Sequence, residues 1–494
     1  MTVLSLVLCL LPHLRAEDAP PPAPATPATP VAPADAVPAE PPAVDEAALF
    51  GGDPDEAAMF GDPAAAEVPV AGAGTTDFGD ISVTRTSDAD ITAKLASYDE
   101  RLTIGGKLFL RASAATAEDV SFADSTFGSA NLLDLYADAR PNDRVRGFAA
   151  ARLNYDFTVA EGDTDDFGTA LSPASVVLDQ LWLKFDLARA VYVTTGRQRI
   201  KWGSGRFWNP TDFMNQQTLD ALSVAVFDER TGVGLLKVHV PIESLGANLY
   251  AVGNFDGADT FEQIGGALRT EWVLGPSEIA LSAAAREGDP VRLGADASAG
   301  VGPFDVHAEA AFRHGDTTPT YTGDYDLATF TEPAAVSHED EWIVEVVGGA
   351  EVSIRYNDED SVAIGAEYFY NSIGYEDATL YPYLAFVGAF TPFYLGKHYA
   401  AGYVYLGGPG NWDEGAFTLS TLANLSDQSL VSRLDVSGTI NTQLRVNVYS
   451  QVHYGEQGEF RFGVDIDPVP GILPDGFTVP TPLVDFGVGA QITF

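Results

Sequence analysis

Three cations occupy every second position near the middle of the chain. Arg197, Arg199 and Lys201 end a run, AVYVTTGRQRIK, in which the residue types alternate. Because successive side chains of a strand point to opposite faces, the three cations should share one face. Val191 and Val193 have the same parity, so either they lie lower on that face or a bulge intervenes. Such a basic face suits a wall that lines water, where rings of charge select ions.

An aromatic loop follows these cations. Residues 202–228 contain Trp202, Phe207, Trp208 and the Asn209-Pro210 pair, which cannot continue a strand ladder. Aromatic surface mixed with amides suits a constriction that contacts a sugar or another polar solute. The alternative is that the aromatic rings only fix the loop to a wall. The residues expected in this constriction loop are Trp202, Trp208, Asn209 and Asp212.

A local excess of positive charge marks the same region, since no acid stands between Asp186 and Asp212. We therefore expect an anion-attracting patch here. The residues expected to line the lumen and set its selectivity are Arg146, Arg152, Arg197, Arg199, Lys201 and Arg206. Lys184 has lumen-facing parity as well, and most lumen charges are expected to neutralise one another across the wall. The acids with lumen-facing parity include Asp156, Glu271, Glu309, Glu345, Glu351 and Glu367.

Catalytic and metal-binding patterns are absent from the sequence. The seven histidines form no HExxH pair, and there is no GxSxG motif and no phosphate loop. The single cysteine, Cys9, lies within the expected export signal, so the mature chain has no thiolate for a metal or a nucleophile. We predict no catalytic residue, no metal site, no cofactor and no enzymatic activity.

Charge and hydropathy exclude two further classes of protein. The 70 acidic and 27 basic residues give a net charge of −43, so nucleic acid is a poor partner. No segment after residue 16 approaches the roughly 18 to 20 unbroken apolar residues of a membrane-spanning helix. A helical membrane protein is therefore excluded.

The first hundred residues divide into three parts. Residues 1–16 resemble a secretory signal that ends at Ala16, although no base precedes the apolar run. Residues 17–80 are rich in Pro and Ala and hold thirteen acids and no base, so a disordered periplasmic tail is expected. Residues 81–101 form a lead-in segment, and residues 102–494 form one β-barrel.

Long alternating runs fill the body of the chain. The clearest are 144–157, 341–356 and 441–454, each with apolar residues on one face and charged or amide residues on the other. Runs of roughly ten to sixteen residues are long enough for tilted strands to cross a bilayer, whereas strands of soluble sheets are nearer five or six. Aromatic residues near strand ends, such as Tyr155, Trp182, Trp342 and Tyr403, are expected in interfacial girdles.

Short and long connections alternate along these runs. Short turns such as 141–143, 188–189 and 275–276 separate long loops such as 203–230 and 372–395. This asymmetry is typical of outer-membrane barrels. The count from Leu102 gives about 18 strands, with 16 as the alternative, if 456–482 is one outer loop. The last strand ends at Phe494, and such a terminal aromatic resembles the signal by which outer-membrane proteins are recognised for assembly.

The segment GRQRIKWGSGRFWNPTDF resembles one in bacterial outer-membrane barrels of the alginate-export-like and phosphate-selective-porin-like kind. The matching residues are Gly196, Arg197, Gln198, Trp202, Gly203, Asn209, Pro210 and Asp212. The resemblance covers about twenty residues and implies a porin-type channel of 16 to 18 strands. It does not identify a solute.

The sequence thus predicts an all-β transmembrane barrel in the outer membrane of a Gram-negative bacterium, with its N-terminal tail in the periplasm. The expected function is passive diffusion of small hydrophilic solutes, with an anion bias near the third outer loop. A non-conducting barrel for anchoring, surface display or adhesion is the alternative, and a barrel-embedded or secreted all-β hydrolase is a weaker one. Expected partners are outer-membrane lipid, the barrel-assembly machinery and the solutes. Assembly of several copies of the chain into a homo-oligomer is an open alternative.

Overall fold

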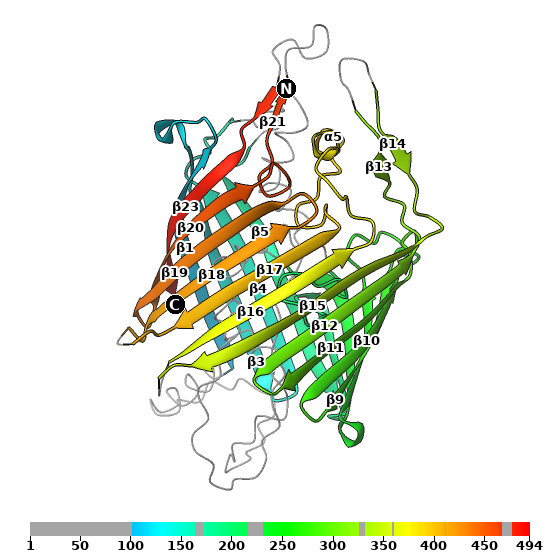
Figure 1. Ribbon diagram of the computed structural model, residues 1–494. Coiled ribbons are helices and arrows are strands. Elements are labelled where there is room, and N and C mark those ends of the chain that lie inside the picture. The colour runs from blue at the N-terminus through cyan, green and yellow to red at the C-terminus, as the bar shows by residue number, and fades with distance from the viewer. Residues whose placement is uncertain are drawn as a thin grey trace.

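The chain forms a closed antiparallel β-barrel of 18 long strands (Figure 1). The computed structural model describes residues 101–163, 171–215, 231–325, 331–357, 360–410, 412–466 and 477–494. The predicted signal, acidic tail and lead-in segment therefore lie outside the described residues, apart from Arg101. The predicted strand count of 18 is confirmed, and the alternative of 16 is wrong.

Each wall strand pairs with its neighbours in chain order, and the first strand pairs with the last. The wall strands are β1 (Leu102–Ala117), β3 (Ala130–Asn142), β4 (Val145–Asp156), β5 (Ala174–Leu187), β6 (Val191–Gln198), β7 (Val233–Ile242), β8 (Ala247–Asn254), β9 (Gly265–Leu274), β10 (Ser277–Ala285), β11 (Arg292–Val301), β12 (Phe304–His314), β15 (Trp342–Arg355), β16 (Ser361–Asn371), β17 (His398–Gly407), β18 (Gly415–Asn424), β19 (Ser429–Asn441), β20 (Leu444–Gly455) and β23 (Pro482–Thr493).

The two ends of the barrel differ, as predicted. One end, the turn end, carries short connections such as 143–144 and 275–276. The other, the loop end, carries long connections that include 118–129, 199–232, 315–341, 372–397 and 456–481. The eighth outer connection, 425–428, is short as well. The remaining short elements are η3 (Phe122–Asp124), β2 (Thr126–Gly128), η4 (Glu243–Leu245), β13 (Thr320–Thr322), β14 (Ala334–Val336), α5 (Tyr381–Phe386), β21 (Val464–Ile466) and β22 (Phe477–Val479).

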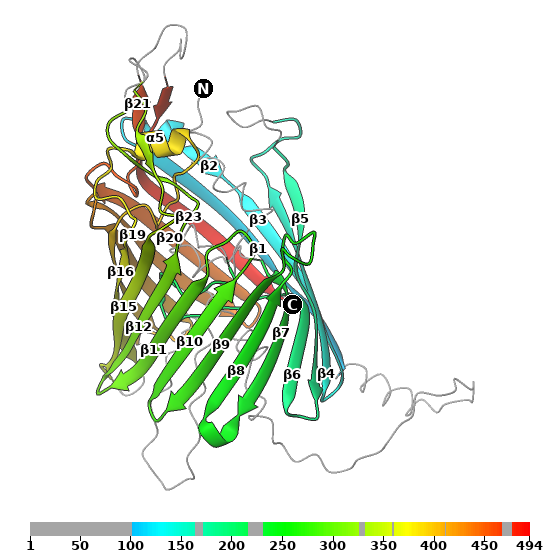
Figure 2. The same ribbon diagram turned by 90° about the vertical axis from the view of Figure 1, so that its right-hand side faces the viewer.

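The small outer elements rise above the loop end, where α5, β13, β14 and β21 lie in Figure 1, and Figure 2 shows α5 and β21 there from the side. β21 pairs only with β22, in a two-stranded sheet of its own. The segment after Glu459 therefore adds no strand to the barrel wall, which confirms that 456–481 is one outer connection. Among the described residues, no helix is long and apolar enough to span a membrane.

The strands are amphipathic because successive side chains alternate between the lumen and the outside. On β4, Leu153 and Tyr155 are exposed on the outer face, whereas Arg152 and Phe148 are buried on the inner one. Leu, Val, Ile and Phe side chains are exposed in the same way on most other strands. An apolar outer face around a polar interior is the arrangement that suits a bilayer.

Two aromatic residues expected in the girdles point into the lumen instead. Trp182 and Tyr403 are buried, while Tyr155 and Trp342 are exposed on the outside as expected. Trp182 stacks on Phe148 across the inner face, at 5.4 Å between ring centroids. The prediction was wrong for both residues because aromatic type near a strand end does not fix parity.

Candidate functional site

The third outer connection leaves the wall at Gln198 and crosses the lumen. Strand β6 ends at Gln198, so Arg199 and Lys201 lie beyond it. Arg197 is still in the strand, opposite Leu181 of β5, whose side chain is 54% exposed on the outer face. The expectation that three cations share one basic face is therefore wrong. Arg197 keeps the outward parity of Val191 and Val193, and the strand stops before the next two cations.

Acids from other strands pair with the cations of this region. A bulge in β5 turns Asp179 inward, where its carboxylate accepts hydrogen bonds from Arg199 at 2.8 and 3.2 Å. Both side chains are buried. Arg197 lies at the loop end, 3.5 Å from Asp256 and hydrogen-bonded to Thr231. Charges that look isolated in the sequence are thus balanced in space.

The first part of the crossing loop, residues 199–215, packs against the wall that it leaves. Trp202 is buried in an apolar cluster on β7, β8 and β9, and the guanidinium of Arg269 lies 5.8 Å from its ring centre. This cluster consists of Ile200, Trp202, Met214, Val233, Leu235, Val252 and Ala267. Trp202 therefore anchors the loop and does not face open lumen.

A buried carboxylate on β12 holds the next turn of the loop. Glu309, 1% exposed, accepts hydrogen bonds from the backbone N–H groups of Ser204 and Gly205 and from the Thr211 hydroxyl at 2.8 Å. Gly203 has a φ of +97°, and a Cβ at Gly205 would lie 2.0 Å from the Trp208 carbonyl oxygen. The two glycines let the backbone wrap the carboxylate as an anion-binding nest.

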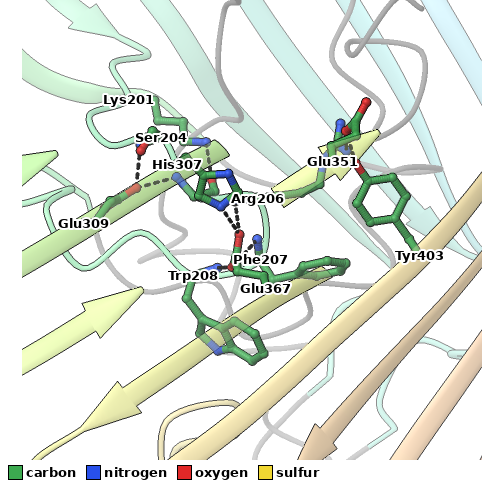
Figure 3. Close-up of polar contacts among 11 residues, drawn as sticks. Lys201, Ser204, Arg206, Phe207, Trp208, His307, Glu309, Glu351, Glu367 and Tyr403 are labelled. Atoms are coloured by element: carbon green, nitrogen blue, oxygen red, sulfur yellow. Dashed lines mark hydrogen bonds and ion pairs between the residues drawn. The ribbon is translucent and has the colours of Figure 1, made fainter. Parts of the chain in front are cut away.

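A second carboxylate, Glu367 on β16, holds the residues that follow (Figure 3). It accepts hydrogen bonds from three successive backbone N–H groups, those of Arg206 at 2.6 Å, Phe207 at 3.0 Å and Trp208 at 2.9 Å. The ring of His307 on β12 also contacts it, at 3.0 Å. Hydrogen bonds to a charged acceptor are stronger than neutral ones, so Glu367 fixes this segment firmly.

Arg206 points to the wall opposite β6. Its guanidinium forms an ion pair with Glu351 of β15 at 2.5 Å and lies 4.3 Å from the ring centre of Tyr403 of β17. The Tyr403 hydroxyl donates a hydrogen bond to the same carboxylate. Arg206 is thus neutralised by contacts that also position the loop.

Trp208 of the crossing loop is fully buried, with no exposed surface. Its ring stacks on Phe369 of β16 at 5.5 Å, and its indole N–H donates to the carbonyl of Phe393 at 3.0 Å. It belongs to an apolar cluster inside the barrel, and the aromatic rings therefore fix the loop at both walls. This cluster, the lumen cluster, consists of Phe207, Trp208, Val347, Phe369, Phe393, Tyr399, Ala401, Tyr403, Leu422, Val431 and Phe460.

The other predicted loop residues serve local turns. Lys201 donates to the Gly205 carbonyl at 3.1 Å. The Asn215 amide donates to the Asp212 carboxylate at 2.8 Å, and Asn209 accepts the backbone N–H of Asp212 at 3.1 Å. The Asn209 side-chain oxygen is buried without a hydrogen-bond partner among the described residues.

The inner face of β4 and β5 carries a separate set of cations. Arg152 is buried against Asp134 at 2.7 Å, and Arg146 pairs with Asp138 at 2.8 Å. Lys184 lies directly beside Arg146 in the strand register. Its ammonium is 6.0 Å from the ring centre of Tyr192 and forms no ion pair with any described residue.

Sequence reasoning placed Glu309 and Glu367 inside the barrel but did not assign them to the loop. It missed Phe393 and Glu459, which lie in outer connections without alternation. Parity indicates which way a strand residue points, but it does not indicate which backbone N–H groups reach it from a segment one hundred or more residues away.

These features define a class of fold, a closed 18-strand barrel whose third outer connection is bound inside the lumen. The chain matches no protein-family model and no curated protein sequence. No family is therefore assigned, and the resemblance to alginate-export-like and phosphate-selective-porin-like barrels stays a prediction.

The chain is similar to several solved structures, among them structures of bacterial outer-membrane proteins. Pseudomonas aeruginosa OpdK with vanillate is 11% identical, with 79% of this chain and 98% of that chain covered and a TM-score of 0.46. Salmonella typhi OmpF in complex with daunomycin is 12% identical, with 80% and 99% covered and a TM-score of 0.39. Pseudomonas putida OprB is 10% identical, with 83% and 97% covered and a TM-score of 0.39. The fold assignment rests on the strand pairing of this chain itself.

Proposed function

We propose that the protein is a porin-type channel for passive diffusion of small hydrophilic solutes through the outer membrane of a Gram-negative bacterium. The observation that carries the proposal is a closed 18-strand wall, apolar outside and charged inside, crossed by a loop fixed at both ends. A barrel of this width leaves an aqueous channel unless something fills it. The N-terminal tail would lie in the periplasm, and the C-terminal strand would contact the assembly machinery.

We place the anion bias of this channel at Lys184 and not at the third loop. Arg197, Arg199 and Arg206 each contact an acid, and Lys201 donates to a carbonyl. Lys184 is the better candidate because it lies next to Arg146 and has no acidic partner among the described residues. An uncompensated cation on a pore wall attracts anions.

Planar-bilayer recording tests both parts of the proposal. Wild-type protein should conduct, and Lys184→Gln should shift the zero-current potential in a KCl gradient toward cation preference. Lys201→Gln is the matched control and should leave that potential nearly unchanged. A larger shift in Lys201→Gln than in Lys184→Gln would return the selectivity to the third loop.

One observation favours the alternative, a non-conducting barrel for anchoring or adhesion. The lumen cluster fills part of the interior with buried aromatic residues, of which Trp208 and Tyr399 have no exposed surface. If folded, heat-modifiable protein gave no conductance in any salt, this alternative would replace the channel.

A further inference from the structure

Phe393 links two outer connections to the crossing loop. Its carbonyl accepts the indole N–H of Trp208 at 3.0 Å, and its own backbone N–H donates to the carboxyl group of Glu459. Its φ is +70°, a left-handed conformation that a bulky residue rarely adopts. Surrounding contacts must hold such a residue in place. The position of the Phe393 carbonyl, which accepts the Trp208 indole N–H, therefore depends on the other contacts of Phe393.

Glu459 supplies one of those contacts from inside the barrel. It stands in the connection after β20, yet its side chain is buried and contacts residues of β17 and β18. Its carboxyl group accepts the Tyr399 hydroxyl at 2.6 Å and the Asn424 amide at 2.7 Å. The next residue, Phe460, packs its ring 5.4 Å from that of Phe393.

We propose that Glu459 is a proton-sensitive positioning residue, which fastens Phe393 and through it Trp208 at the loop end of the lumen. We call Trp208, Phe393 and Glu459 the latch. When Glu459 is protonated, the latch is closed. When Glu459 ionises, its carboxylate is buried among aromatic rings without a cation in contact from the described residues, and the connection 456–463 moves outward toward water.

The titratable groups near Glu459 in the described part of the chain lie on four neighbouring elements. Asp427, in the turn after β18, accepts the backbone N–H of Glu459 at 2.8 Å. Tyr399 approaches from β17. Tyr381 of α5 contacts the same Asn424 amide at 3.3 Å, and His453 of β20 contacts the carbonyl of Phe460 at 2.5 Å. The charge nearest to Glu459 is thus negative.

The sign of the pH dependence follows from this environment. Burial, and to a smaller extent the Asp427 carboxylate, raise the pKa of Glu459 to about 8, although hydrogen bonds from Tyr399, Asn424 and Phe393 oppose the rise. The closed latch therefore binds a proton more tightly than an exposed glutamate does. Its stability is full below the ordinary glutamate pKa and is lost as the pH rises through about 8. Between these two pH values each pH unit should weaken the latch about tenfold, and above about pH 8 the weakening should level off.

Amide hydrogen exchange of the folded protein in detergent micelles tests the latch without reference to conductance. Protection of peptides covering 388–396 and 456–463, corrected for intrinsic exchange rates, should fall in the wild type between pH 5 and pH 8 and change little above that. Glu459→Gln should keep that protection across the range, because an amide, like the protonated acid, is neutral. Glu456→Gln, which changes an exposed acid of the same connection, is the control and should follow the wild type.

A second variant keeps the test possible if the Glu459→Gln chain fails to fold. Asp427→Asn removes the neighbouring charge that raises the pKa of Glu459, so the loss of protection should be smaller and should end at lower pH. The proposal is overturned if wild-type protection is constant over the range, or if Glu459→Gln loses protection as the wild type does.

Bilayer recording then connects the latch to the proposed channel, since open-channel conductance should change over the same pH range. If the protein gave no conductance but its amide protection still fell with pH, the channel proposal would be refuted and the latch proposal would stand.

Discussion

Individual charges in this protein are balanced by partners that are remote in sequence. The acids that neutralise Arg199, Arg197 and Arg206 are Asp179, Asp256 and Glu351. A stretch without acids therefore does not mean an uncompensated patch. Two further acids, Glu309 and Glu367, are satisfied by backbone N–H groups, which explains how carboxylates stay buried inside the barrel.

Glu367→Gln tests the residue-scale account of the crossing loop. The change removes the charge that three successive N–H groups share, and hydrogen bonds to charged groups are worth about 1.5–3 kcal/mol. Loop docking should weaken by about that amount, with faster amide exchange in residues 203–211 and more open-channel noise. Glu339→Gln, at an exposed acid of the 315–341 connection, is the control. Equal exchange in both variants would contradict the role of Glu367.

At the scale of elements, the crossing loop behaves as an internal strut. Apolar contacts hold it at β7–β9 and at β15–β17, and two carboxylates hold the segment between them. The tight turn at Gly203 and Gly205 makes this route possible, because larger residues would collide with Glu309 or with the Trp208 carbonyl.

Gly205→Ala should displace the strut and leave the wall intact. Its Cβ would lie 2.0 Å from a backbone oxygen, so the turn must rearrange at a cost of about 1–3 kcal/mol. We expect altered single-channel conductance together with unchanged heat-modifiable migration. In Gly402→Ala the nearest atom to the new Cβ lies at 3.6 Å, so this control should match the wild type. Wild-type conductance in Gly205→Ala would argue against a lumen-crossing strut.

At the scale of the whole molecule, closure of the barrel depends on pairing between its first strand, β1, and its last strand, β23. β1 and β23 pair over most of their length, and Gly106 exchanges two backbone hydrogen bonds with Phe494, at 2.8 and 3.0 Å. The Phe494 ring lies over Gly106, where a Cβ would approach it to 2.8 Å. The terminal residue is thus part of the seam.

Phe494→Ala separates the ring from these backbone bonds. If the terminal aromatic is an assembly signal, the fraction of chain recovered in the outer membrane as heat-modifiable barrel should fall severalfold. Phe494→Tyr keeps an aromatic ring and should assemble normally. Recovery of Phe494→Ala at the wild-type level would remove Phe494 from the assembly argument and leave it with a role in closure alone.

The sequence by itself determined the class of fold and the asymmetry of the two ends, and it predicted about 18 strands with 16 as the alternative. These properties are local: alternation over 144–157 or 441–454 specifies an amphipathic strand, and turn length specifies which end it joins. Parity also sufficed to place Arg152, Glu309 and Glu367 inside the barrel, because side-chain direction in a strand repeats every two residues.

Only the tertiary structure decided what the third outer connection does. The end of β6 at Gln198 and the bulge at Asp179 change side-chain direction without a periodic signal in the sequence. The partners of Trp208 come from β16 and from the 372–397 connection, far away along the chain. Closure of the barrel brings these segments together across the lumen, and local residue patterns contain no information about such distances.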